Sequence, residues 1–162
     1  MPEVIADTSV IHYLFQSNHF RLLPSLYENL AIPNAVKNEL DEGRKLGILL
    51  PHTSDYAWIQ LISIGEQRLV PQIPGLGRGE REVLSLSMNW PNSLALLDDG
   101  LARQYAKRLN IRFTGTLGIL LKAKQSGLID RVGPVIDSLK QLGFRVSEET
   151  RAGVLRLAAE GE

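Results

Sequence analysis

Acidic residues follow two short apolar segments of this chain, at places where a carboxylate is costly unless it serves a purpose. Asp7 comes directly after residues 4–6, and Asp98 and Asp99 come directly after residues 94–97. If both segments are strands of one parallel sheet, their carboxyl ends lie at the same edge, and the acids meet there. Like charges that converge from distant parts of a chain are tolerated mainly where a hard cation such as Mg²⁺ neutralises them. Metal-assisted chemistry on phosphate is therefore the leading interpretation.

Two glutamates lie within the apolar faces of predicted helices. At about 100° per residue, Glu39 falls inside the face formed by Ala35, Val36, Leu40 and Leu46. Glu80 falls near the centre of the arc formed by Val83, Leu84, Leu86 and Met88, whereas Glu82 points to the far side. A glutamate on an apolar face needs a compensating partner. A metal is one candidate; a buried arginine, or solvent at a first helical turn for Glu80, is the other.

A second interpretation applies to each strand-end acid. Aspartate is a favoured N-cap residue, and Asp7-Thr8-Ser9 is good capping chemistry. Asp98 and Asp99 are open to the same explanation. Each of them, taken alone, is as well explained by a helix cap as by a metal.

The composition of the chain limits the classes of protein to which it can belong. The 162 residues are 44% hydrophobic, which is enough for one substantial core, and we expect a single domain over residues 1–162. The absence of cysteine excludes disulfides, zinc–thiolate sites and cysteine nucleophiles. No apolar run approaches the ~20 residues of a membrane span, and the start of the chain lacks a basic leader region, so we expect a cytoplasmic protein without membrane contact.

The net charge is zero, but basic residues concentrate in one region. Residues 101–131 contain one acid, Asp130, and seven bases: Arg103, Lys107, Arg108, Arg112, Lys122, Lys124 and Arg131. An acidic centre beside a basic flank suits a polyanion that is held while a metal acts on it. The alternative is an ordinary solvated helix surface.

The hydrophobic pattern alternates between strands and helices, which predicts a mostly parallel sheet covered by helices on both faces. The expected strands are residues 3–6, 30–32, 58–64, 94–97 and 111–114. The expected helices are residues 10–16, 22–29, 33–45, 80–89, 102–109, 116–125, 133–142 and 148–160. Residues 47–56 and 69–79 are expected as loops.

Four segments in this order resemble PIN domains, in particular a VapC-like, prokaryotic nucleic-acid-binding subgroup. They are Ile5-Ala6-Asp7-Thr8-Ser9, Gly77-Arg78-Gly79-Glu80-Arg81-Glu82, Leu96-Leu97-Asp98-Asp99 and Thr114-Gly115-Thr116-Leu117-Gly118. The resemblance covers about residues 1–130 and leaves a helical extension over about 131–162. It implies a three-layer α/β/α sandwich whose parallel strands have the order 3-2-1-4-5.

The resemblance also implies an activity and a site. The activity is Mg²⁺- or Mn²⁺-dependent cleavage of single-stranded RNA, in many members as a toxin silenced by a small antitoxin. Asp7, Glu39, Glu80 and Asp98 match the catalytic, metal-binding acids. Glu82 is a rival for the third position, and Asp99 is a rival or auxiliary ligand for the fourth.

The expected contacts with RNA and with proteins rest on other residues. Thr8, Ser9, Thr114 and Thr116 are candidates to orient water or phosphate, with helix capping as the alternative. The residues expected to hold the RNA backbone are Arg103, Lys107, Arg108, Lys122 and Lys124. A homodimer is expected because residues 46–50 form an apolar run without a place in the core. Two other functions stay open: a nucleic-acid-binding module with a weakened metal site, and a protein chiefly engaged in antitoxin binding.

Overall fold

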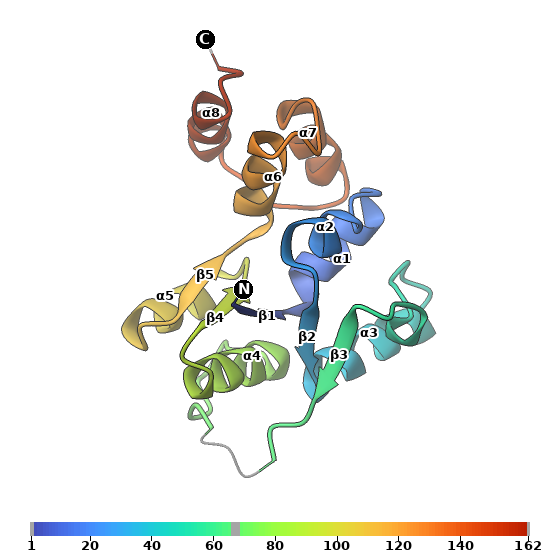
Figure 1. Ribbon diagram of the computed structural model, residues 1–162, viewed down its shortest axis with the longest axis vertical. Helices are drawn as coiled ribbons and strands as arrows, with labels where there is room; N and C mark the ends of the chain where they lie inside the picture. The colour runs from blue at the N-terminus through green and yellow to red at the C-terminus, as the bar shows by residue number, and fades with distance from the viewer. Residues whose placement is uncertain (1, 66–68, 162) are drawn as a thin grey trace.

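The centre of the molecule is a five-stranded, all-parallel sheet. The computed structural model describes residues 2–65 and 69–161. The strands are β1 (Glu3–Ala6), β2 (Leu30–Pro33), β3 (Ile59–Ile62), β4 (Ser93–Leu96) and β5 (Arg112–Thr114), in the order β3-β2-β1-β4-β5 (Figure 1). This is the parallel sheet and the strand order implied at the sequence level, and both are confirmed.

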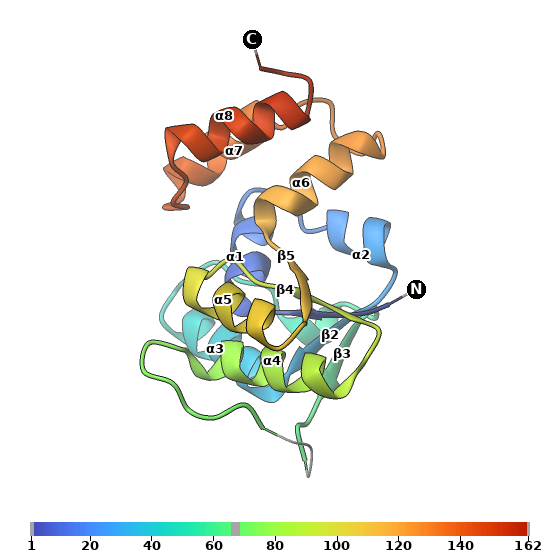
Figure 2. The same ribbon diagram turned by 90° about the vertical axis from the view of Figure 1, so that its left-hand side faces the viewer.

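Helices cover both faces of the sheet and make the fold a three-layer sandwich. One face carries α3 (Asn34–Lys45), α4 (Arg78–Asn89) and α5 (Gly100–Arg108). The other carries α1 (Thr8–Gln16), α2 (Leu22–Tyr27) and α6 (Thr116–Gln125), as Figure 2 shows from the side. A short 3-10 turn, Thr53–Asp55, interrupts the predicted loop before β3.

The strand order reverses between β1 and β4, and this switch positions the acids. Glu3 to Ala6 pair in register with Ser93 to Leu96, and the Asp7 N–H continues the ladder by donating to the Leu96 carbonyl at 3.1 Å. Asp7 and Asp98 therefore leave the sheet at the same edge. A crevice at the carboxyl ends of strands where the order reverses is the usual ligand site of such sheets.

Aliphatic side chains from both layers form the core. The central strand is buried along Val4, Ile5 and Ala6, and Val10, Ile11 and Leu14 of α1 pack against it. No helix in the described part of the chain is long and apolar enough to span a membrane. The apolar run at residues 46–50 is divided: Leu50 is buried, whereas Leu46 and Leu49 are 79% and 66% exposed.

The last two helices, α7 (Gly133–Gln141) and α8 (Glu148–Leu157), lie beyond α6 and are tied to it through one carboxylate. Glu160 accepts hydrogen bonds from the backbone N–H groups of Val132 and Gly133 (2.6 and 3.0 Å) and from the Lys124 ammonium (2.9 Å). Lys124 also donates to the Ala158 carbonyl at 2.6 Å. The first turn of α7 and the end of α8 are thereby joined to α6.

The hydrogen bonds to the Glu160 carboxylate predict how the free energy of unfolding changes at acidic pH. Burial by itself raises the pKa of Glu160, but the N–H groups of Val132 and Gly133 and the Lys124 ammonium lower it to about 2. Because the folded-state pKa lies below the ordinary value of 4.5, the contribution to stability is present above about pH 4.5 and is lost as the pH falls toward about 2. A shift of this size corresponds to at most about 3 kcal/mol.

Glu160→Gln should therefore lower the free energy of unfolding at pH 7, and the difference from the wild type should shrink at pH 3. Urea denaturation at the two pH values measures this. The matched control is Glu149→Gln, which removes an exposed carboxylate from the first turn of α8 and should change stability by only a few tenths of a kcal/mol. Equal effects of the two variants at pH 7 would contradict the anchoring role of Glu160.

Candidate active site

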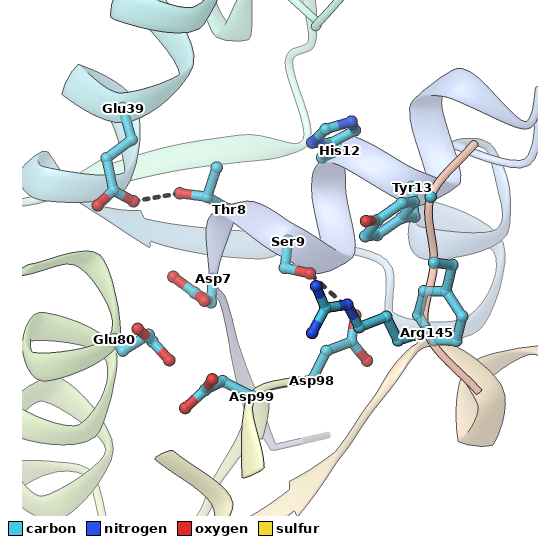
Figure 3. Close-up of a pocket in the computed structure, with 12 residues that line it drawn as sticks. Asp7, Thr8, Ser9, His12, Tyr13, Glu39, Glu80, Asp98, Asp99 and Arg145 are labelled. Carbon is cyan, nitrogen blue, oxygen red and sulfur yellow. Dashed lines mark hydrogen bonds between the residues drawn. The ribbon is translucent and has the colours of Figure 1, made fainter. Parts of the chain in front are cut away.

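The strand-end and helical acids line one pocket. Its volume is about 540 Å³, and it opens at the switch between β1 and β4. The acids on its surface are Asp7, Glu39, Glu80, Asp98 and Asp99. Figure 3 shows the carboxylates of Asp7, Glu80 and Asp99 pointing toward one another, with Glu39 on one side of them and Asp98 on the other. The pocket thus brings together five of the six candidate acids, all except Glu82.

Asp7 is the most buried of these acids, at 5% exposure. It occupies the N-cap position of α1, yet its side chain makes no capping hydrogen bond. Burial raises the pKa of Asp7 well above its ordinary value; the Thr8 N–H opposes this shift, and the neighbouring carboxylates of Glu80, Glu39 and Asp98 add to it. The helix-cap interpretation therefore does not account for Asp7.

Glu39 is held in place by two donors from different elements. The Thr8 hydroxyl donates to Oε1, and the Gly79 N–H at the start of α4 donates to Oε2 at 3.3 Å. The hydroxyl of Thr8 thus orients an acid across 31 residues of sequence and is not a helix cap. Glu39 lies on the side of α3 that the helical periodicity assigned to it.

Glu80 and Glu82 have separate roles. Glu80 is in the first turn of α4, where Oε1 accepts from the Gly77 N–H at 2.9 Å, while the buried Oε2 has no partner in the described part of the chain. Burial raises the pKa of Glu80 to about 7; the Gly77 N–H opposes the shift and the Asp99 carboxylate adds to it. Glu82 instead accepts from the Ala35 N–H at 3.0 Å, so it caps α3 and is not among the residues lining the pocket.

The two aspartates after β4 also differ. Asp98 accepts from the backbone N–H and the hydroxyl of Thr116, both at 2.7 Å, and from the Ser9 hydroxyl at 3.3 Å. Asp99 is the N-cap of α5 and accepts from the Ala102 N–H at 3.0 Å. Ser9 and Thr116 therefore orient Asp98, and Asp99 combines a structural cap with a place on the pocket surface.

A glycine lets the elements of the site approach closely. A Cβ on Gly79 would clash with Glu39 Oε1 and lie 3.1 Å from Asp7 Oδ1, so any side chain there would displace the Glu39 carboxylate. Gly115 faces Asp98 in the same way, since its Cβ would lie 2.7 Å from Asp98 Oδ1. Gly79 and Gly115 thus leave the space that the carboxylates of Glu39 and Asp98 occupy.

The donor set of the pocket fits a hard divalent cation. It offers carboxylate oxygens, one of them buried and unpartnered, and no lysine or arginine in the described residues forms an ion pair with any of the five acids. Mg²⁺ and Mn²⁺ prefer oxygen ligands of this kind. Within residues 2–65 and 69–161, no three His, Cys, Asp or Glu side chains already stand in an arrangement that could hold one ion. The expectation that Asp7, Glu39, Glu80 and Asp98 converge on one metal position stays a prediction.

The basic flank is less uniform than the sequence suggested. The Lys124 ammonium donates to Glu160 and to the Ala158 carbonyl, so it is already engaged within the fold. Lys122 lies over the Tyr27 ring at 4.6 Å, and Arg108 lies over the Tyr105 ring at 5.1 Å. A second pocket adjoins the acidic one. Neither pocket is lined by any of four expected RNA-binding residues, Lys107, Arg108, Lys122 and Lys124. Arg103 lines the adjoining pocket, which shares Asp98 with the first.

Sequence reasoning missed one cation at the site. Arg145, between α7 and α8, lines both pockets together with Phe144. The sequence shows only a short apolar piece between two helices there, and no periodicity relates Arg145 to the distant acids. The signal that could have found it is local: Gly143 after one helix and Ser147 before the next mark a fixed connection.

The site and the fold agree with one family. A model of the PIN domain matches residues 3–160. The chain belongs to the PIN domain family. The match includes α7 and α8, and so extends beyond the resemblance recognised in the sequence, which covers about residues 1–130.

A solved structure shows the same fold. The PIN domain endonuclease Utp24 is similar to this chain with a TM-score of 0.50 and 15% identity, over 70% of this chain and 84% of that one. A comparison with curated proteins found no match. Membership of the PIN domain family, with five acids in one pocket, supports assigning the chain to the nucleases.

The close approach of Glu39 to Gly79 predicts that a side chain at position 79 weakens metal binding. Gly79→Ala should displace the Glu39 carboxylate and weaken Mn²⁺ binding by about 10- to 100-fold, as the loss of a supporting contact around a metal typically does. Stability should change little, since alanine favours the helix and compensates by about 0.5–1 kcal/mol. Titration calorimetry with Mn²⁺ and a thermal melt measure the two effects.

Gly100→Ala is the matched control. Gly100 is also in the first turn of a helix beside an acid of the pocket, but a Cβ there would meet nothing within 4 Å. This variant should bind Mn²⁺ as the wild type does. Unchanged binding in Gly79→Ala would show that Glu39 is not needed for the cation.

Proposed function

We propose that this PIN domain is a Mg²⁺- or Mn²⁺-dependent endoribonuclease that hydrolyses phosphodiester bonds of single-stranded RNA. The observation that carries the proposal is the pocket at the β1–β4 switch, where Asp7, Glu39, Glu80 and Asp98 gather and form no ion pair with any described lysine or arginine. A set of buried like charges is costly to a fold, and a function that needs a divalent cation explains why it is retained.

Asp7, Glu39, Glu80 and Asp98, with Asp99 as an auxiliary ligand, would hold the cation. When bound, such a cation lowers the pKa of a coordinated water and stabilises negative charge on a phosphodiester. The protein's own residues prepare this arrangement. Thr8 fixes Glu39, while Thr116 and Ser9 fix both oxygens of Asp98. The Gly77 N–H holds one oxygen of Glu80 and leaves the other directed to the pocket.

The two glutamates of α4 provide the test. Glu80→Gln should reduce Mg²⁺-dependent cleavage of a single-stranded RNA by at least about 100-fold, because the variant removes a charge from the metal-binding set. Glu82→Gln should keep most of the activity, because the glutamine oxygen can still accept from the Ala35 N–H. Cleavage of an end-labelled RNA, with and without EDTA, measures both.

The two variants differ by two positions in one helix and remove the same charge, so each controls for the other. Products with 5′-phosphate and 3′-hydroxyl ends are expected. Equal loss in both variants, or cleavage that persists in EDTA, would be incompatible with the assigned site.

We further propose that the protein acts as the toxin of a toxin–antitoxin pair. Support comes from the resemblance of the segments around Asp7, Glu80 and Asp98 to VapC-like proteins. A small antitoxin protein would then be the partner that silences the nuclease.

A homodimer is also proposed, on the exposed apolar residues after α3. Leu46, Ile48 and Leu49 are 79%, 41% and 66% exposed and adjacent in the chain. An exposed apolar cluster of this kind typically marks a contact surface. Light scattering should report twice the 18.0 kDa chain mass, and Leu46→Glu with Leu49→Glu should return it to a monomer. A wild type that remains monomeric across micromolar concentrations would exclude this dimer.

A further inference from the structure

The connection between α7 and α8 passes the acidic pocket. Its residues Gly143, Phe144 and Arg145 line that pocket together with the acids. In Figure 3 the Arg145 side chain extends from the connection toward Ser9 and Asp98. Arg145 is the single lysine or arginine among the described residues that line this pocket.

Arg145 is held in place from both sides. Helix α7 ends in a Schellman motif: the Gly143 N–H donates to the Lys140 carbonyl and the Phe144 N–H donates to the Leu139 carbonyl, both at 3.0 Å. Gly143 has φ +100°, a conformation that favours glycine.

Phe144 and Ser147, on either side of Arg145, also hold the connection in place. The Phe144 ring packs edge-on against the Tyr13 ring of α1 at 5.1 Å, and the Ser147 hydroxyl caps α8 by accepting from the Thr150 N–H at 3.0 Å. The backbone that carries Arg145 is therefore attached to the layer that also carries Thr8 and Ser9.

The charge of Arg145 is not used within the fold. The side chain is exposed, and no residue in the described ranges makes a hydrogen bond, ion pair or ring contact with it. Other bases nearby are engaged, such as Arg103 over the Phe113 ring at 5.0 Å and Lys124 with Glu160. Asp98, the acid toward which Arg145 extends, already receives hydrogen bonds from Thr116 and Ser9 on its two oxygens.

A second pocket continues from the first. It has a volume of about 230 Å³ and shares Asp98, Phe144 and Arg145 with the acidic pocket. Arg103 from α5 and Ser147 and Thr150 from α8 also line it. The first pocket is lined mainly by acids, whereas the second is lined by Arg103 and Arg145 with Asp98 as its one acid among the described residues. A polyanion that the carboxylates repel is therefore attracted by the positive charges directly beside them.

We propose that Arg145 binds the backbone phosphate next to the scissile one, and that the strand continues through the second pocket past Arg103. A guanidinium suits this role because it binds phosphate oxygens in a bidentate, charge-assisted manner. The inference rests on the proposed nuclease function, since it names the residue that positions the substrate strand at the same site. Arg145 contacts substrate and takes no part in bond cleavage.

Binding without cleavage tests the proposal. The probes are a fluorescein-labelled 12-nucleotide single-stranded RNA and the DNA of the same sequence, measured by anisotropy in EDTA at several salt concentrations. Arg145→Ala should weaken binding of both probes by about tenfold and reduce the slope of log affinity against log salt by about 0.7, the value for one phosphate contact on a single strand. Arg145→Lys should restore the slope and only part of the affinity.

Arg156→Ala is the matched control. It removes the same charge from an exposed position of α8 that lines neither pocket, and it should bind both probes as the wild type does. Thermal melts of all variants should agree, because the side chains of Arg145 and Arg156 make no hydrogen bond or ion pair with any described residue. In a cleavage assay with Mg²⁺, Arg145→Ala should raise KM by a similar factor and change kcat little.

The outcomes separate the inference from the proposed function. A wild type that cleaves RNA, with an Arg145→Ala variant equal to it in affinity and salt slope, overturns the inference and leaves the nuclease intact. Arg145-dependent binding without any metal-dependent cleavage upholds the contact of Arg145 with a backbone phosphate and overturns the nuclease. Affinity that rises in Arg145→Ala would make Arg145 a counter-ion of the acids, and a loss confined to the RNA probe would place its contact on the 2′-hydroxyl; either result overturns the phosphate contact.

Discussion

The constraint on which the site depends is the burial of Asp7 among like charges. Its position is fixed by the backbone, because it follows the central strand and its N–H continues the β1–β4 ladder. Glu39, Glu80 and Asp98 all raise the pKa of Asp7 beyond the effect of burial. A charged group in such a place usually has a basic partner, and the described residues supply none.

The surrounding residues organise the acids without neutralising them. Their donors are hydroxyls and backbone N–H groups: Thr8 and Gly79 for Glu39, Gly77 for Glu80, and Thr116 and Ser9 for Asp98. Such donors fix the direction of each carboxylate but leave its negative charge in place. A lysine or arginine in the same positions would satisfy the acids and also compete with a cation. Because these donors are neutral, they orient the carboxylates without adding a positive charge that would compete with a cation.

The sequence predicted the elements well because their hydrophobic periodicity is local. All five strands and the helices that carry the acids lie where the pattern put them, and the strand order implied by the family resemblance is confirmed. Helical phase also separated Glu80 from Glu82, because direction on a helix depends only on residue spacing. Partners could not be predicted in this way. The hydrogen bond from Ser9 to Asp98 spans 89 residues, and Lys124 looks like any other exposed base until α8 places Glu160 beside it. Arg145 was missed for the same reason: its role depends on where a connection between two helices lies, and periodicity carries no such information.

The two charges of the site are built on different parts of the fold. The acids lie directly after β1, on α3 and α4, and directly after β4, and these elements pack against one another. Arg145 depends on α7, whose first turn is held by Glu160 and whose end is fixed by Gly143 and by Phe144 on Tyr13. Because Lys124 joins Glu160 to α6, the start of α7 is connected by hydrogen bonds to the helical layer of the sandwich. The structure therefore places the negative site that suits a cation and the positive charge that suits a polyanion on different elements. These elements meet at α1, which supplies Tyr13 to the connection that carries Arg145 and Thr8 and Ser9 to the acids.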